Sequence, residues 1–207
     1  MKPLLTNTHP ALQLLTLFLI WITLTFLSSA IIGIALPHDV TTATPHAILI
    51  TQTISEIISF LLTAIIYSLL FLGNPLPNLY ITANTRNYLQ APIAAIIVIL
   101  LIPLVDWLTL FNDSIHLPAT LTPLENALRS VSTLSEELLQ PILLNPSPSA
   151  FIINILVIAL CPAICEEIFF RSSLQQTLQR TLHNPHWAII LSATIFSLAH
   201  GEIFASL

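Results

Sequence analysis

Two adjacent carboxylates stand in an apolar run, in CPAICEEIFFRSSLQ at residues 161–175. An ionised carboxylate at bilayer depth costs roughly 2.5–3.5 kcal/mol, so acids placed there indicate a functional site. Glu167 and Arg171 are four residues apart and can form an ion pair on one helical face. Glu166 lies about 100° round the helix from Glu167. Because a like charge nearby and a low dielectric both disfavour ionisation, Glu166 is predicted to be the general base and Glu167 a supporting acid.

The second candidate is a histidine, His200, in the last apolar segment, FSLAHGEIFASL. The Asn-Pro pair at 184–185 breaks a helix and predicts a turn before this segment. Counted from residue 183, Glu166 lies 17 residues before and His200 lies 17 residues after. In an antiparallel helical hairpin each would be about 25 Å from the turn, at 1.5 Å per residue. The acids and the imidazole are therefore predicted to lie at the same height.

A glutamate and a histidine that meet in an apolar bundle could activate a water for hydrolysis. They could also bind a divalent metal such as zinc, although two or three ligands leave a zinc site incomplete. Cys161 and Cys165 could add thiolates, but buried free cysteines are usually packing residues. The structural alternatives are a stabilising Glu167–Arg171 pair and a hydrogen-bonded core histidine at His200.

The composition places these residues in a membrane. The chain has 207 residues, 55% of them hydrophobic and 7% charged, whereas soluble domains carry about 25% charged residues. With only five Lys and Arg, the chain has no basic cluster for nucleic acid, and membrane lipid is the expected partner. Each span needs roughly 20 apolar residues. Five segments come near this length: 11–36, 47–73, 89–111, 150–171 and 187–207.

The only long hydrophilic stretch, 112–149, separates the third and fourth apolar segments. Apolar residues recur at helical spacing in its middle, LTPLENALRSVSTLSEELLQPIL. This pattern predicts an amphipathic helix on the membrane or the bundle, ending before Pro141. Thr122 and Glu125 predict a capping box at its start.

The predicted fold is all-α: a multi-pass transmembrane helix bundle of about five spans plus one amphipathic interfacial helix. We expect one membrane domain over residues 1–207, with a motif-bearing core at 150–207. The chain stops in apolar sequence at Leu207, so we expect it to be truncated at the C-terminus.

With the N-terminus in the cytoplasm, four of the five basic residues face the cytoplasm and Arg129 lies outside, as the positive-inside rule expects. The four are Lys2, Arg86, Arg171 and Arg180.

The two motifs resemble those of the CAAX prenyl protease and bacteriocin-processing family (CPBP, also called ABI) of intramembrane proteases. EEIFFR matches the EExxxR motif of this family, and FSLAH matches its FxxxH motif. The second motif lies on the next helix, and together they cover residues 161–201. The part of the chain that precedes residue 161 is similar to the family only in architecture.

The resemblance implies an all-helical membrane bundle that cleaves a peptide bond near the cytoplasmic side. Glu166 would activate the water, with Glu167 and Arg171 as its supports. His200 would be the second catalytic residue, with Phe196 packing beside it. The resemblance also implies a glutamate-dependent mechanism without a metal cofactor, acting on a peptide or membrane-protein substrate in the cell membrane.

The chain departs from the family pattern at two points. Ser172 stands where a glycine commonly follows the motif arginine, and a later helix with an HxxxN-type motif is expected beyond Leu207. The predicted function is an intramembrane endopeptidase. The alternatives are a non-catalytic immunity or scaffold protein that keeps the fold, and a small transporter. The transporter fits less well because no pair of broken helices is evident.

Overall fold

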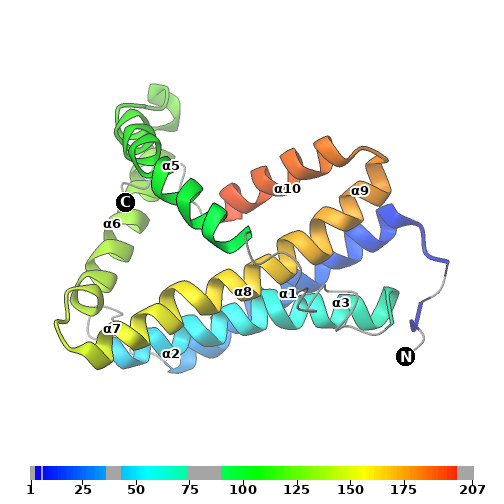
Figure 1. Ribbon diagram of the computed structural model, residues 1–207, viewed down its shortest axis with the longest axis horizontal. Helices are drawn as coiled ribbons and strands as arrows, with labels where there is room; N and C mark the ends of the chain where they lie inside the picture. Colours follow the sequence, from blue (N-terminus) through cyan, green and yellow to red (C-terminus); the bar gives the residue numbers. More distant parts are fainter. Residues whose placement is uncertain (1–2, 6, 36–42, 74–89, 200–207) are drawn as a thin grey trace. The chain divides into compact units, whose positions relative to one another are not determined.

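The computed structural model describes residues 3–5, 7–35, 43–73 and 90–199, and all regular structure in these ranges is helical (Figure 1). The chain divides into two compact units. The first comprises residues 1–81 with 140–196, and the second comprises 82–139 with 197–207. The all-α prediction is confirmed for the described ranges, and the single-domain organisation stays a prediction.

Four described helices are long and apolar enough to span a membrane, and a fifth apolar helix is shorter. The four are Pro10–Ile34, Pro45–Phe71, Pro92–Asn112 and Pro148–Leu182, and the fifth is Pro185–Ala199. The chain is therefore a multi-pass membrane protein, as predicted. The fourth helix runs past the predicted span end at residue 171, because its continuation holds no helix breaker before the Asn-Pro pair at 184–185.

The first unit is built from two long helices, the N-terminal helix α1 and the shorter helix α10. One long helix joins α2 (Pro45–Glu56), η2 (Ile57–Leu62) and α3 (Thr63–Phe71). The other joins α7 (Pro148–Asn154), η5 (Ile155–Leu160), α8 (Cys161–Glu167), η6 (Ile168–Gln175) and α9 (Gln176–Leu182). The remaining two helices are α1 (Pro10–Ala35) and α10 (Pro185–Ala199). The segments η2, η5 and η6 are π-helical.

Local sequence signals set the ends of these helices. The Thr44 hydroxyl accepts a hydrogen bond from the Ala47 amide at 3.3 Å, and Pro45 takes the first position of α2. After α9, His183 adopts a left-handed conformation with φ of 54° and ends the helix. The Asn184 side chain then accepts from the amide of His186 at 3.0 Å and caps α10. These are the residue types that stop and start helices, so the turn before α10 is encoded locally.

The core of the first unit is aromatic and joins α1, η2 and η6. The Trp21 ring lies 5.1 Å from the Phe169 ring and 6.0 Å from the Phe60 ring, measured between centroids. Phe170 packs edge-on against Phe169 at 4.9 Å. The buried cluster consists of Leu17, Tyr67, Phe71, Phe169, Phe170, Leu174, Leu178 and Ala188. This packing holds the acid-bearing helix against α1 and η2.

The second unit contains α5 (Gln90–Asp113), the short 3₁₀ turn η4 (Ala119–Leu121) and most of α6 (Thr122–Leu143). The amphipathic helix is present as α6, but the predicted end before Pro141 is wrong. The last turn continues through the proline, although Pro141 has no N–H to donate to the carbonyl four residues earlier. Ile142 in that turn is buried, and its carbonyl accepts a hydrogen bond from the Asn154 side chain at 2.8 Å. The position of α6 on the membrane stays a prediction.

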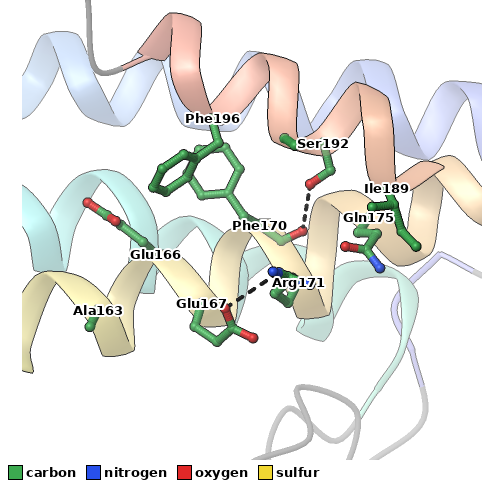
Figure 2. Close-up of a pocket in the computed structure, with 10 residues that line it drawn as sticks. Ala163, Glu166, Glu167, Phe170, Arg171, Gln175, Ile189, Ser192 and Phe196 are labelled. Carbon is green, nitrogen blue, oxygen red and sulfur yellow. Dashed lines mark hydrogen bonds and ion pairs between the residues drawn. The ribbon is translucent and has the colours of Figure 1, made fainter. Parts of the chain in front are cut away.

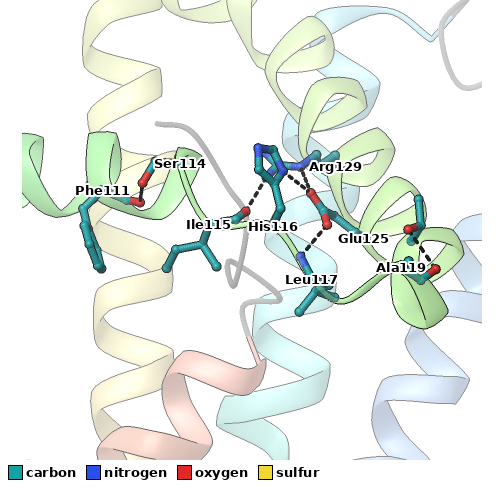
Figure 3. A network of polar contacts seen from close by, with 9 residues as sticks. Phe111, Ser114, Ile115, His116, Leu117, Ala119, Glu125 and Arg129 are labelled. Atoms are coloured by element: carbon teal, nitrogen blue, oxygen red, sulfur yellow. Dashed lines mark hydrogen bonds and ion pairs between the residues drawn. The ribbon is translucent and has the colours of Figure 1, made fainter.

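The carboxylate of Glu125 ties α6 to the loop that precedes it (Figure 3). It accepts hydrogen bonds from the Leu117 amide at 2.7 Å and from Arg129 Nε at 3.0 Å, and His116 Nδ1 lies 3.1 Å away. These contacts lower the pKa of Glu125 to about 2, and the hydrogen bond with His116 has the largest effect. The predicted capping box with Thr122 is wrong, because η4 comes before α6 and the Thr122 hydroxyl donates to the Ala119 carbonyl.

The network around Glu125 predicts a pH dependence of local stability. A lowered pKa in the folded state stabilises the fold above the ordinary value of about 4.5, and the stabilisation is lost as the pH falls towards 2. We expect the hydrogen-exchange protection factors of residues 115–125 to fall across this window. In Glu125→Gln this fall should be absent, whereas the control Glu137→Gln, at an exposed position of α6, should keep it. An equal fall in wild type and Glu125→Gln would contradict the prediction.

Candidate active site

The helix that carries both acids changes its geometry immediately after them. Residues Cys161–Glu167 are α-helical and Ile168–Gln175 are π-helical. Within this π-helical segment the Ser173 hydroxyl donates to the Ile168 carbonyl, five residues earlier, at 3.4 Å. π-Helical turns are rare and are frequently found at functional sites. Here the wider turn sets how Arg171 and the residues after it are directed relative to the acid pair.

A cavity of about 370 Å³ lies between this helix and α10 (Figure 2). Six lining residues come from the acid-bearing helix: Ala163, Glu166, Glu167, Phe170, Arg171 and Gln175. Four come from α10: Ile189, Ser192, Ala193 and Phe196. We call this cavity the groove. Four of the five predicted site residues line it: Glu166, Glu167, Arg171 and Phe196.

The predicted ion pair between Glu167 and Arg171 is present. Arg171 Nε lies 3.6 Å from Glu167 Oε2, and the two side chains are 61% and 67% exposed. An exposed pair of this length contributes little to stability. The pair brings the guanidinium and one carboxylate together beside the groove, which both residues line.

The predicted antiparallel hairpin is also present, and two contacts define its register. The Ser192 hydroxyl donates to the Phe170 carbonyl at 3.3 Å. The rings of Phe170 and Phe196 meet edge-to-face with centroids 5.0 Å apart. Together these contacts bring α10 back along the acid-bearing helix. His200 lies outside the described residues, so its height relative to Glu166 stays a prediction.

The two cysteines lie on the acid-bearing helix and are not cross-linked. Cys161 is half-buried and Cys165 is buried. The segment α8, which carries both cysteines and both acids, packs against α2, whose last residue is Glu56. Within the described ranges, no three His, Cys, Asp or Glu side chains are grouped so that they could hold a metal ion.

One family comparison bears on the helices that form the groove. Residues 148–206 match the type II CAAX prenyl endopeptidase Rce1-like family. The match begins at the first residue of α7 and includes both motifs. It confirms the resemblance to CPBP proteases and supports a CAAX protease-type function at this coarse level. Curated proteins and solved structures include no significant match to the chain.

The Rce1-like region also contains residues that sequence reasoning did not select. Ser192 lies among the apolar residues of α10, and its hydrogen bond to Phe170 could not be read from spacing. Gln175 stands one turn after Arg171, and this i,i+4 spacing is the signal that could have placed it on the same face. Ser172, where the family commonly has a glycine, is buried.

Proposed function

We propose that the chain is an intramembrane endopeptidase of the CAAX-protease type, with Glu166 as the base that activates water. Glu166 takes a proton from the water, whose oxygen adds to the carbonyl carbon of the scissile peptide bond. The C–N bond then breaks, and the leaving nitrogen receives a proton. The proposal rests chiefly on one observation: both acids of EExxxR and the phenylalanine of FxxxH line a single groove.

Glu167 and Arg171 have a supporting role in this proposal. The ion pair places a positive charge beside the acid pair and offsets the repulsion between two adjacent carboxylates. Glu166 can then accept a proton while Glu167 remains ionised. His200, one turn after the groove residue Phe196 in sequence, would share that proton and pass it to the leaving nitrogen.

The rest of the proposal concerns cofactor, partners and location. The mechanism needs only a glutamate and a histidine, and we propose that it uses no resident metal. The proposed partners are membrane lipid and a peptide or membrane-protein substrate, with no nucleic acid. We place the protein in the cell membrane with its N-terminus in the cytoplasm, because this orientation puts four of five basic residues on the cytoplasmic side.

The proposal can be tested with the whole protein in lipid nanodiscs and a mixed-sequence library of end-blocked decapeptides. Mass spectrometry should detect cleavage by wild type. His200→Ala should lower the rate about 10²-fold or more, as expected for a general acid–base residue. The control His186→Ala, at an exposed position in the first turn of α10, should cleave as wild type does.

Three outcomes would count against parts of this proposal. A wild-type protein that cleaves no peptide, and that tolerates Glu166→Gln and His200→Ala in cells, would favour the immunity or scaffold alternative. Uptake coupled to ions or pH and lost in these variants would favour a transporter. Loss of cleavage with 1,10-phenanthroline, restored by zinc, would contradict the metal-free mechanism.

A further inference from the structure

Gln175 is a polar residue of the groove that the proposed chemistry does not use. Its carboxamide lies beside Ile189, at the end of the groove away from Glu166 (Figure 2). The side chain is half-buried and makes no hydrogen bond to any residue that the structure describes. A carboxamide offers two N–H donors and one carbonyl acceptor. Gln175 therefore brings unused donors and an acceptor to this end of the groove.

The neighbouring polar groups are already engaged. The Ser192 hydroxyl donates to the Phe170 carbonyl, and Arg171 is paired with Glu167. A peptide that enters the groove gives up water around part of its backbone, and its N–H and C=O groups then need other hydrogen-bond partners. A carboxamide can donate to a peptide carbonyl and accept from a peptide N–H at the same time.

We propose that Gln175 binds the backbone of an extended peptide in the groove and so positions the bond that is cleaved. This inference rests on the proposed function. Gln175 follows Glu166 by nine residues, about 13 Å along a helix at 1.5 Å per residue and slightly less across a π-helical turn. An extended peptide advances about 3.3 Å per residue. Gln175 therefore contacts the peptide about four residues from the scissile bond, and on one side of that bond only.

The test compares Gln175→Ala with wild type on a cleaved decapeptide and on versions shortened stepwise from each end. For the full peptide, Gln175→Ala should raise KM about tenfold and leave kcat unchanged, the effect of losing one well-formed hydrogen bond. Once the peptide has fewer than about four residues on the recognised side, the two proteins should have equal KM. Gln176→Ala is the matched control: Gln176 has the same side chain but does not line the groove, and its KM should equal that of wild type.

A structural role for Gln175 makes a different prediction. If Gln175→Ala lowers kcat to the same extent for peptides of every length, the inference is overturned while the proposed function stands. If wild type cleaves nothing, the proposed function fails, and photo-crosslinking with diazirine-bearing decapeptides decides the inference separately. Crosslinking that is weaker in Gln175→Ala than in Gln176→Ala supports the backbone contact. Equal or absent crosslinking overturns it.

Discussion

Glu166→Gln is expected to lower kcat by about 10²- to 10⁴-fold and to leave KM nearly unchanged. Glutamine keeps the size of the side chain but cannot accept a proton from water, and general-base catalysis contributes about this factor. Because the loss arises in the transition state, kcat and kcat/KM should fall together. Initial rates measured in nanodiscs over a range of peptide concentrations check the prediction.

Glu167→Gln tests which of the two adjacent acids is the base, since both are glutamates and both line the groove. It breaks the 3.6 Å pair with Arg171 but leaves the proposed base intact. We expect a smaller loss of kcat, about tenfold, since the pair orients the site and takes no proton from the water. If Glu167→Gln were the more damaging variant, the assignment of base and supporting acid would be inverted.

The largest expected effect on stability is that of Phe169→Ala. The Phe169 side chain is 0% exposed, and its ring lies 5.1 Å from Trp21 and 5.5 Å from Phe60. Such a truncation in a soluble core costs about 3–5 kcal/mol. Lipid is itself apolar, so the transfer contribution is smaller in a membrane and lost packing dominates. We therefore expect a loss of about 2–3 kcal/mol in the free energy of unfolding.

Phe151→Ala is the matched control for Phe169→Ala. It removes the same ring from the same long helix, at a position that is 64% exposed. Its effect should stay within about 0.5 kcal/mol. Unfolding by sodium dodecyl sulfate, followed by circular dichroism, measures both variants. Equal effects at the two positions would show that the aromatic cluster does not stabilise the first unit.

Features that depend on a few neighbouring residues could be predicted from the sequence. The Glu167–Arg171 pair follows from helical spacing, and the turn before α10 follows from an Asn-Pro pair. The acids were recognised as a candidate site because burying charge is costly in lipid. The family match over residues 148–206 agrees with motifs that are themselves local.

Where prediction failed, a contact from outside the helix or its repeat overrode a local signal. Pro141 is a helix breaker by type, yet the last turn of α6 continues through it, with Ile142 buried and bonded to Asn154. Glu125 had the spacing of a capping box, yet its carboxylate bonds to the loop before the helix. A proline inside a helix costs roughly 3 kcal/mol and a lost N-cap typically about 1 kcal/mol. At these two places the burial of Ile142 and the charged hydrogen bonds of Glu125 oppose those local preferences.

The sequence alone was enough to place two acids, an arginine and a phenylalanine on neighbouring membrane helices of a protease-like protein. The groove between those helices depends on their register, which the Ser192–Phe170 hydrogen bond and the Phe170–Phe196 ring contact define. These contacts join residues 22 and 26 positions apart. A repeat of 3.6 residues tells which face a side chain takes on its own helix, but not which residue of another helix it meets. For that reason Gln175 and Ser192 became candidates only once the two helices were seen packed together.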